Sequence, residues 1–441
     1  MNRLLITVTT FILLAGNCHQ LYGQKLYDLE AAIVTALDNN YSILIARNRQ
    51  DIATGNFTRG NAGLLPTVDL SGRYGGTLNS TLQRFDDGGE SSSSGVHNRS
   101  ATAGVNLGWS IFRGFHARTT YQKLEELSNL GELATQQAVE NLIARIVSEY
   151  NFYLQQRRLY SNLNFALDIS RERLRIDEEK YLLGAGSKLQ LLQSRVYFNS
   201  DSSRLARQSE VLRASEIRLN ELMAVDDLAR RITVADTAIH IDHSLSYEML
   251  LGETIAMNTS LNIARTNKMI SGHDYRIIAS RSYPYINLTS GYSGSVNSYG
   301  SGNINQQLGG GFSYGVTLGM GIFDGYNRQR ERRNAEIEIE NTRLRYEEIE
   351  QQVIADLLTI WSGYSSNLSL IELEKQNLAT ASENLEIAME RYRLGNLSGL
   401  DLREVQKSLL DAEERLLSIE YQTKLAEISL MQISGNILGY L

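Results

Sequence analysis

Two carboxylates near the C-terminal end are the most suggestive pair of charged side chains in the sequence. Asp401 and Glu404 are three residues apart, and residues at this spacing share one face of a helix. If several copies of the chain met around one axis, the pair would form a ring of carboxylates, which attracts cations and raises the barrier for anions. The alternative is structural, because Asp401 follows Ser398 at the spacing of a helix cap. The pattern predicts either a cation-selective constriction or a cap.

The other candidate residues do not form a site. His240 and His243 have a spacing that is found in metal sites, but no clustered third ligand accompanies them. Four arginines between positions 328 and 333 lack interleaved aromatic residues, which favours a solvated helix start or a junction between the strands and the long helices over nucleic-acid binding. We find no glycine-rich phosphate loop, no nucleophile elbow and no zinc-binding helix. The sequence therefore predicts no enzymatic activity, no cofactor, no metal and no nucleic acid.

The composition is typical of an ordered protein with long helices. Apolar residues make up 42% and charged residues 21% of the 441 positions, and the net charge is only −7. Pro66 and Pro284 are the two prolines of the chain. Because proline interrupts helices, long continuous helices are possible.

The N-terminus has the pattern of a secretory signal over residues 1–23. Arg3 precedes an apolar run from Leu4 to Ala15, which is too short to span a bilayer. The single cysteine, Cys18, lies within this segment, where Asn17 disfavours a lipid-attachment site. No later run reaches the roughly 18 apolar residues that a membrane helix needs. We therefore expect an exported chain that is secreted, periplasmic or part of an outer-membrane β-barrel.

The chain contains an internal duplication. Residues 107–114 (LGWSIFRG) return as 318–325 (LGMGIFDG), and residues 180–187 (KYLLGAGS) return as 391–398 (RYRLGNLS). Both pairs share an offset of 211 residues, so the sequence between them is in register. Duplication predicts a pseudo-symmetric architecture in which each element has a partner.

Each repeat is expected to contain an opening helix, a β-hairpin and two long helices joined by a tight turn. In repeat 1 (residues 24–223) these are about 26–60, 67–112 and 114–223, and in repeat 2 (residues 247–441) they are about 247–279, 285–323 and 324–434. The segment 224–246 between them is polar and is expected to be a connection with little core.

The predicted hairpins alternate apolar and polar residues. Val68, Leu70 and Tyr74 alternate with polar neighbours, and so do Val316 and Leu318. Runs of about ten residues with one apolar face match a membrane β-strand. Polar loops such as residues 86–95 would lie in water. The alternative is a soluble sheet that is buried on one face.

The long helices carry a coiled-coil pattern. Apolar residues recur at seven-residue spacing over 146–181 and again over 357–392. About 70 residues at about 1.5 Å each give a rod near 100 Å, longer than a globular domain needs. Gly184 and Gly395 fit helix-ending positions, and Ser187 and Ser398 fit the N-caps of the returning helices.

Four strands per chain are too few to close a barrel, for which about eight are needed. An open sheet edge in lipid leaves unpaired backbone groups, so strands must come from several chains. Two copies would give eight strands and a filled interior, whereas three give twelve. We therefore expect a homotrimer around a lumen.

At this level of detail the chain resembles the outer-membrane efflux proteins typified by TolC. The resemblance covers nearly the whole predicted mature chain and rests on the order of short duplicated motifs. These are the run from Ala32 to Arg47, Leu64-Leu65-Pro66, Ile111 to Gly114 with Ile322 to Gly325, and Tyr181 to Gly184 with Tyr392 to Gly395. The family implies a mixed fold: a trimer with a 12-stranded membrane β-barrel and a long α-helical coiled-coil barrel that forms a periplasmic tunnel. It also implies a periplasmic adaptor protein, an inner-membrane pump and outer-membrane lipid as partners.

The resemblance also assigns roles to residues of the tight turns. It implies a pore constriction lined at Asp401, Glu404 and Tyr392, and at the positions of Gln190 and Gln193 in repeat 1. It implies that the turns contact the adaptor, with Gly184, Ser187, Gly395 and Ser398 at the tips. The chain departs from the family pattern at Leu397, where the family has arginine, and at Gln190, where it has an acid. Packing and uncharged hydrogen bonds are therefore expected to hold a closed tip.

The predicted function is passive conduction from the periplasm through the outer membrane, as the exit duct of a tripartite efflux or secretion system. The alternatives are a periplasmic helical scaffold and a surface stalk. The sequence does not name the cargo, because the pump that selects it is another polypeptide.

Overall fold

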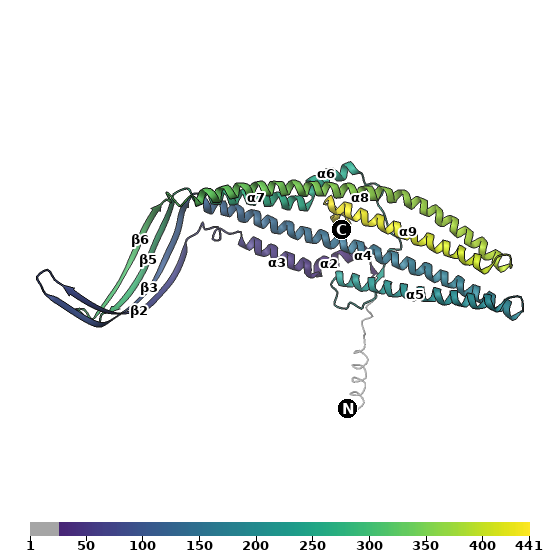
Figure 1. Cartoon of the computed structure of the whole chain (residues 1–441), viewed down its shortest axis with the longest axis horizontal. Helices are drawn as coiled ribbons and strands as arrows, with labels where there is room; N and C mark the ends of the chain where they lie inside the picture. Colours follow the sequence, from purple (N-terminus) through teal and green to yellow (C-terminus); the bar gives the residue numbers. More distant parts are fainter. Residues whose placement is uncertain (1–25) are drawn as a thin grey trace, which may run out of the picture. The chain divides into compact units, whose positions relative to one another are not determined.

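The structure is a computed structural model that describes residues 26–441, so the predicted signal peptide and Cys18 lie outside the described residues. Its helices and strands follow each other twice in the same order (Figure 1). They are β1 (Leu26–Tyr27), α2 (Leu29–Asn39), α3 (Tyr41–Asn56), β2 (Thr67–Arg84), β3 (Glu90–Arg113), α4 (His116–Leu182), α5 (Lys188–Leu222), β4 (Thr233–Val234), α6 (Tyr247–Met257), α7 (Thr259–Ser280), β5 (Tyr285–Ser298), β6 (Gln306–Gly319), α8 (Asn327–Arg393), α9 (Gly399–Ile433) and the 3₁₀ helix η1 (Ile437–Tyr440). Helices α4 and α8 each contain 67 residues, and α5 and α9 each contain 35.

The opening segment of each repeat is divided into two helices, where the sequence pattern predicted one. Asn40 separates α2 from α3, and Asn258 separates α6 from α7. Asn40 has φ of −65° and ψ of 124°, and Asn258 has φ of −55° and ψ of 120°, so neither is helical. Each donates from Nδ2 to the carbonyl oxygen of a distant residue, Asn40 to Leu222 at 2.9 Å and Asn258 to Ile433 at 2.8 Å. These carbonyls end α5 and α9, where a helix lacks intrahelical donors. Each helix break therefore caps the end of another helix.

The chain forms two compact units, and each takes segments from both repeats. One unit contains the described residues up to Ala46 together with 136–259 and 350–441, and the other contains 47–135 and 260–349. The second unit, called here the sheet unit, holds the four-stranded sheet, nearly all of α7, and the parts of α3, α4 and α8 that lie within residues 47–135 and 260–349. Contacts between neighbouring helices place them in the order α3, α4, α7, α8. The contacts join Thr54 to Ser128, Lys123 to Asp274, and Ser271 to Thr342.

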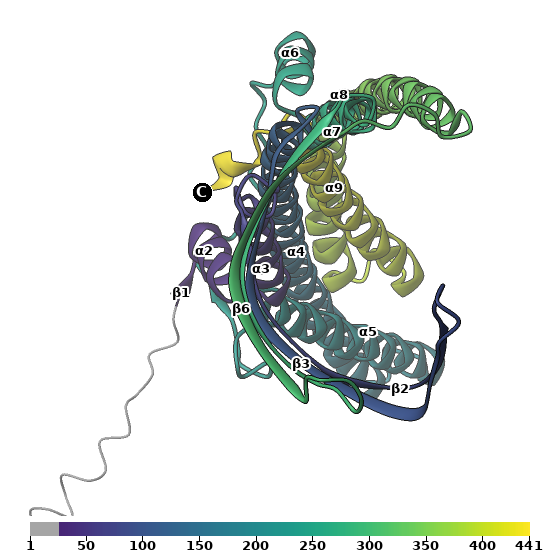
Figure 2. The same cartoon turned by 90° about the vertical axis from the view of Figure 1, so that its left-hand side faces the viewer.

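The sheet is antiparallel, with the strand order β2-β3-β5-β6, and it is visibly curved (Figure 2). Register places one row of apolar residues across all four strands: Leu70, Val105, Tyr292 and Phe312. The adjacent row, on the other face of the sheet, is Asp69, Asn106, Gly291 and Ser313. The apolar row is 47% to 82% exposed, so nothing in the described part of the chain covers it.

Two strand boundaries differ from the expectation. Strand β6 ends at Gly319, although the alternating pattern continues to position 323. Gly319 pairs with Tyr285, and the residue before Tyr285 is Pro284, which has no N–H to continue the ladder. The predicted loop over 86–95 is also shorter, because β3 begins at Glu90, which pairs with Arg84. The repeated serines at 91–94 therefore belong to a strand.

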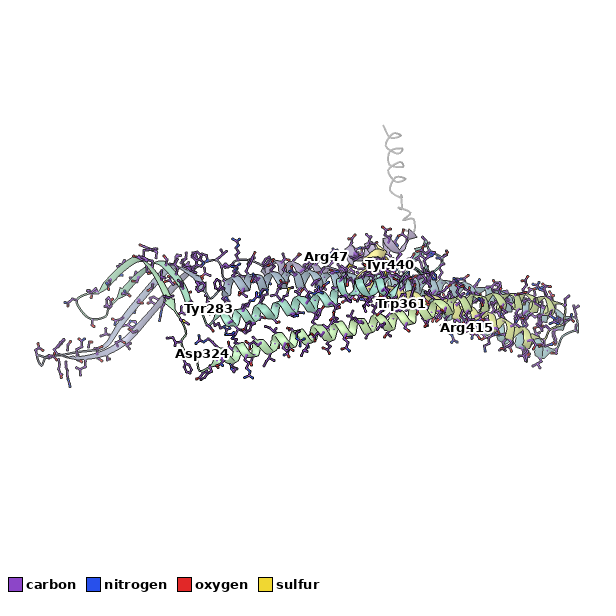
Figure 3. The ribbon with its side chains drawn as sticks, turned by 90° about the horizontal axis from the view of Figure 1, so that it is seen from above. Arg47, Tyr283, Asp324, Trp361, Arg415 and Tyr440 are labelled. Carbon is purple, nitrogen blue, oxygen red and sulfur yellow. The ribbon has the colours of Figure 1, made fainter. Side chains whose placement is uncertain are left out.

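The Ile-Phe-x-Gly motifs mark the turn from strand to long helix. Gly114 and Phe115 both have positive φ, and so do their equivalents Gly325 and Tyr326. A Cβ on Gly114 would collide with the carbonyl oxygen of Ser280, so this position requires glycine for space as well as for its backbone angle. Tyr283 and Asp324 mark this end of the sheet in Figure 3.

The other unit, called here the helical unit, holds the main apolar core. Its fully buried side chains include Ile33, Ile143, Ile146 and Tyr150. The connecting segment 224–246 contributes Ile232 and Val234 to this core, contrary to the expectation of little core. No helix among the residues that the structure describes is both long and apolar enough to cross a membrane.

Equivalent residues of the two repeats hold the connecting segment. Tyr153 donates its hydroxyl to the carbonyl oxygen of Ile232, and Tyr364, 211 positions later, donates to that of Asp242. The buried acids Glu216 and Glu427 are also 211 positions apart and accept from the connecting segment, through Arg231 and through the backbone N–H of Asp242. Glu427 also accepts from Tyr440, labelled in Figure 3.

Candidate functional site in the turns of the long helices

The two tight turns have the local geometry that the sequence predicts. Gly184 and Gly395 have φ of 74° and 78°, which ends α4 and α8 in the left-handed conformation. Ser187 caps α5 through a complete capping box with Gln190. Ser398 caps α9 by accepting from the backbone N–H of Asp401. The turns are therefore compact reversals within the helical unit.

The predicted constriction residues occupy different environments. Asp401 is exposed and its carboxylate accepts from the Ser398 hydroxyl at 2.7 Å, so it has the structural role of the alternative interpretation. Glu404 is also exposed and lies on the same face of α9. The Gln190 side chain is engaged in the capping box, and Gln193 is exposed. Leu397 packs against the apolar residues between the helices.

Tyr392 is buried between the repeats instead of facing solvent. Only 4% of its surface is exposed, and its hydroxyl donates to Oδ1 of Asp177 at 2.5 Å. The other oxygen of Asp177 accepts from Ser194. Asp177 belongs to α4, Ser194 to α5 and Tyr392 to α8, so one buried carboxylate connects three helices.

A second buried carboxylate lies further along the same helices. Asp201 of α5, which is 3% exposed, accepts two hydrogen bonds from Arg403 of α9, at 2.6 and 2.8 Å. It also accepts from Ser170 of α4, which in turn accepts from Gln406 of α9 at 3.1 Å. We call the residues around the two carboxylates the tip network. Its members are Ser170, Asp177, Ser194, Asp201, Tyr392, Arg403 and Gln406.

Cations and aromatic rings fill the space between the two carboxylates. The ring of Tyr197 lies between two guanidinium groups, with the centroid 4.9 Å from Cζ of Arg173 and 5.0 Å from Cζ of Arg403. Nζ of Lys180 lies 4.7 Å from the centroid of the Tyr392 ring. Such stacking places positive charge on the negative face of a ring. The network therefore joins the α4–α5 pair to the α8–α9 pair by charge as well as by hydrogen bonds.

Tyr392 keeps its proton over the physiological pH range. Burial raises the pKa of its phenol, and the hydrogen bond to Asp177 and the charge of that carboxylate raise it further. The phenol thus remains a hydrogen-bond donor at any pH at which the cell envelope works.

The tip network is asymmetric between the repeats. The positions equivalent to Asp177, Ser194 and Asp201 are Ala388, Val405 and Ala412. Ala388 and Val405 belong to the apolar contact between α8 and α9, and Ala412 is also buried. Repeat 1 therefore supplies both acids, and repeat 2 supplies the tyrosine and the arginine that donate to them.

The resemblance implied that Tyr392 lines a pore constriction, and it did not predict the partners of Tyr392 in the tip network. A polar stripe in the sequence could have indicated these partners, because Ser194, Asp201, Gln208 and Ser215 recur every seven residues. All four side chains are buried on α5. Polar residues at core positions of a coiled coil mark a specific pairing. Among the described residues there is no group of three or more histidine, cysteine, aspartate or glutamate side chains that could hold a metal ion, at His240 and His243 or elsewhere.

Comparisons with known proteins agree along nearly the whole chain. The family model described as outer membrane efflux protein matches residues 32–225 and 250–436. The sequence is 24% identical over 420 residues to the cation efflux system protein CusC of Escherichia coli O157:H7, covering 92% of this chain and 85% of that protein. It is 21% identical over 416 residues to the outer membrane protein TolC of Vibrio cholerae serotype O1, covering 91% and 89%. The fold is similar to the crystal structure of the Campylobacter jejuni CmeC outer membrane channel, with a TM-score of 0.77 and 17% identity over 92% of this chain and 85% of that one.

Proposed function

We propose that this chain, which belongs to the outer membrane efflux protein family, forms one third of a passive exit duct across the periplasm and the outer membrane. Membership of the family and location in the outer membrane, both predicted from the sequence, are confirmed by the comparisons. The further assignments below, the trimer, its closed barrel, its partners and its constriction, are our proposal.

The main support for this proposal is the four-stranded sheet. It exposes a row of apolar residues on one face and polar residues on the other, and β2 and β6 each pair with one strand only in the described chain. An uncovered apolar face suits lipid, but an open edge in lipid leaves backbone groups unpaired, at several kcal/mol each. Pairing β6 of one copy with β2 of the next removes both edges. Three copies would close twelve strands around a lumen.

The turns of the long helices are the proposed contact with the rest of the pump. Gly184, Ser187, Gly395 and Ser398 form two short reversals, and Leu183 and Leu394 beside them are 83% and 72% exposed. Exposed leucines at helix ends favour a protein partner. We assign this partner as a periplasmic adaptor, which would connect the duct to an inner-membrane pump that supplies the energy and selects the cargo.

The tip network is the proposed means of holding the narrow end closed. The family pattern of charges at Leu397 and Gln190 is absent, but the acids Asp177 and Asp201 provide equivalent bonds from within the same chain. Asp401 and Glu404 remain exposed, and three copies would place six such carboxylates at the constriction. Their negative charge would favour cations at the entrance.

The test is the conductance of the purified protein in planar bilayers. We expect channels in the wild-type protein and a reduced preference for cations in the Asp401→Asn, Glu404→Gln double variant. The matched control is Asp168→Asn with Glu172→Gln, an acidic pair on α4 that already bonds to arginines. Channels with unchanged selectivity in the first variant would remove the carboxylate ring from the proposal, and a protein without channels would remove the duct.

A further inference from the structure

We propose that a cavity at the junction of the sheet and the long helices binds an anionic phospholipid from the membrane leaflet next to the helices. Aromatic side chains would contact the first carbons of an acyl chain, and two arginines would bind the phosphate. This inference rests on the proposed function, because it takes the apolar face of the sheet to lie in lipid.

The cavity lies where strand β3 extends beyond its neighbour β2. Strand β2 begins at Thr67, which pairs with Gly108, so residues 109–113 of β3 have no strand on that side. The segment that precedes β2 passes there, and Trp109 donates from Nε1 to the carbonyl oxygen of Leu64 at 3.1 Å. Between this segment, the end of β3 and the start of α4 is a cavity of about 390 Å³. This volume lies within the range of ligand sites.

Part of the lining of the cavity is aromatic. It contains Trp109, Phe112 and Phe115, and the last two rings meet edge to face with their centroids 5.3 Å apart. Trp109 and Phe115 are 38% and 59% exposed. Register places Phe112 with Ile286 and Leu318 in the last row of the apolar face before the helices. The cavity therefore continues the surface that faces lipid in the proposed barrel, at the level where membrane barrels have aromatic residues.

The lining also contains two guanidinium groups. Arg113 ends β3 and Arg118 lies in the first turn of α4, and both residues are exposed. Among residues 26–441 neither guanidinium has a hydrogen-bond or ion-pair partner, and the lining contains no acid. Because arginine binds the oxygens of a phosphate through two parallel hydrogen bonds, a phosphate group fits the charge of this lining.

The internal duplication shows that the turn itself does not need these charges. In repeat 2, Phe323 and Tyr326 form an equivalent edge-to-face pair, at 5.4 Å. The two arginines of repeat 1 are replaced there by Asp324 and Gln329. An acid near the start of a long helix is favoured by the helix dipole, whereas an unpaired cation is disfavoured. The arginines of repeat 1 therefore indicate a ligand and not a requirement of the fold.

An anionic phospholipid matches both parts of the lining. A free phosphate ion would use the arginines and leave the exposed aromatic rings in water. A lipid without net charge would use the rings and leave the positive charge of the arginines unbalanced. The phosphate of an anionic phospholipid lies at the edge of the hydrocarbon, and Arg113 directly follows the last apolar row of β3.

Trp109 can report whether the cavity is occupied. The chain has two tryptophans, and the other one, Trp361, belongs to the helical unit and is labelled in Figure 3. The Trp361→Phe protein therefore keeps Trp109 as its single tryptophan. Bromine on an acyl chain close to the glycerol quenches tryptophan fluorescence on contact. The protein would be reconstituted in phosphatidylcholine vesicles in which a fixed fraction of the lipid is brominated phosphatidylglycerol or brominated phosphatidylcholine.

We expect the brominated phosphatidylglycerol to quench Trp109 more strongly than the brominated phosphatidylcholine at the same fraction. Arg113→Gln and Arg118→Gln should each lower this preference for the anionic lipid by about fivefold, which corresponds to about 1 kcal/mol for each cation near an anionic membrane surface.

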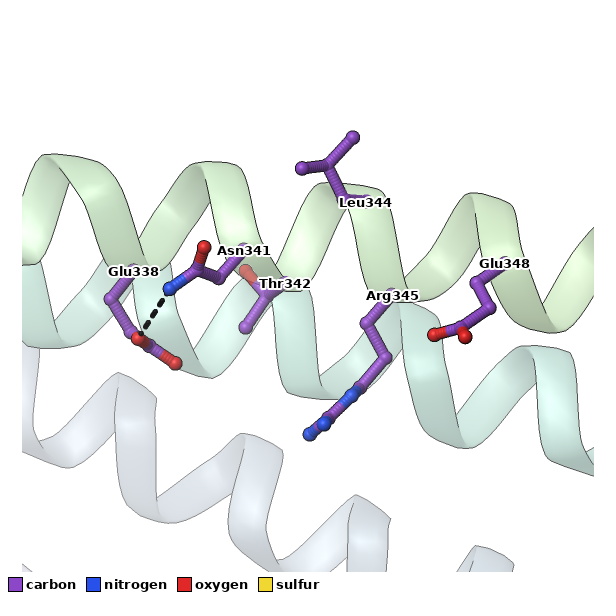
Figure 4. A pocket seen from close by; sticks show the side chains of 6 residues that line it. All are labelled: Glu338, Asn341, Thr342, Leu344, Arg345 and Glu348. Atoms are coloured by element: carbon purple, nitrogen blue, oxygen red, sulfur yellow. Dashed lines mark hydrogen bonds between the residues drawn. The ribbon is translucent and has the colours of Figure 1, made fainter.

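The matched control is Arg345→Gln in the same Trp361→Phe background. Arg345 is another exposed arginine of the sheet unit, and it has no ion-pair partner in the described part of the chain. Figure 4 shows it in a polar groove of α8 with Glu338 and Glu348, whereas Leu344 points away. Because this groove lacks aromatic residues, Arg345→Gln should leave the lipid preference unchanged.

Each outcome bears on the lipid site or on the duct separately. Equal quenching by the two lipids in the Trp361→Phe protein would overturn the anionic site and leave the duct, and this comparison holds even if the arginine variants assemble poorly. A preference that inorganic phosphate abolishes at constant ionic strength would overturn a lipid as the ligand. No quenching by either lipid would overturn both this inference and the lipid-facing sheet. Quenching with the expected preference, in a protein that forms no channels in planar bilayers, would support the lipid site and remove the duct.

Discussion

The bond between Tyr392 and Asp177 allows a sharp test of how the narrow end is held. Tyr392→Phe removes one hydroxyl and keeps the ring, so the cation–π contact with Lys180 remains. Asp177 would then keep the hydrogen bond from Ser194 and the buried ion pair with Arg173, whose Nε lies 3.9 Å from Oδ2 of Asp177. Because the bond joins α4 to α8, any separation of the two helix pairs must break it in the wild-type protein.

The magnitude follows from the charge of the acceptor. A hydrogen bond to a charged group contributes roughly 1.5–3 kcal/mol. At about 1.4 kcal/mol for each factor of ten, its loss shifts the equilibrium between closed and open tips by about 10- to 150-fold per copy. If the three copies open together, the shifts multiply.

Single-channel recording in planar bilayers measures this shift as open probability. Tyr181→Phe is the matched control, because Tyr181 is the equivalent position in repeat 1 and is 41% exposed, against 4% for Tyr392. We expect Tyr392→Phe to raise the open probability and Tyr181→Phe to leave it near the wild-type value. Equal behaviour of the two variants, with trimers intact, would refute the role of the tip network in closure.

Two further predictions concern folding. Gly114→Ala should lower the midpoint of urea unfolding well below that of Gly325→Ala. Both glycines have positive φ, which costs an alanine about 1–2 kcal/mol, but only Gly114 also lacks space for a Cβ. Equal midpoints for the two variants would contradict the predicted collision with Ser280. Burial raises the pKa of Glu413 above 4.5, and its Oε2 atom has no hydrogen-bond partner in the described chain. A raised pKa means that the folded state binds the proton more tightly, so ionisation destabilises the fold as pH rises above about 4.5. Glu413→Gln should therefore raise the melting temperature at about pH 7.5 and have less effect at about pH 4, and a larger gain at the acidic pH would contradict the assignment.

Local signals in the sequence were enough to predict the turns of the long helices. Gly184 and Ser187, and the corresponding Gly395 and Ser398, have local preferences that decide where a helix ends and where the next begins. The same is true of the Ile-Phe-x-Gly turns, although the collision with Ser280 that makes Gly114 necessary was not visible in the sequence. Helix ends and caps of this kind are predictable because they depend on residues that are close together in the sequence.

The partners of Tyr392 were not predictable by the same means. Asp177 is 215 residues away, and the relative height of two long helices depends on packing along their whole length. The heptad pattern shows which side of a helix is buried but not which residue it meets. The broken opening helices were missed for a similar reason, because Asn40 and Asn258 bond to carbonyls that lie 182 and 175 residues away.

The end of β6 illustrates a different limit. The alternation of apolar residues continues past Gly319, so the pattern alone extends the strand. The strand stops because its neighbour β5 begins after Pro284. The length of a strand thus depends on the neighbouring strand with which it pairs, and the sequence of the strand alone does not show where that neighbour begins.

The asymmetry of the tip network means that the two halves of the chain are not interchangeable. Both acids come from repeat 1, whereas alanine stands at the matching positions of repeat 2, and Arg403 of repeat 2 is matched by Leu192 in repeat 1. A chain made of two copies of repeat 1 would lose the arginine that bonds to Asp201, and a chain made of two copies of repeat 2 would lose both carboxylates.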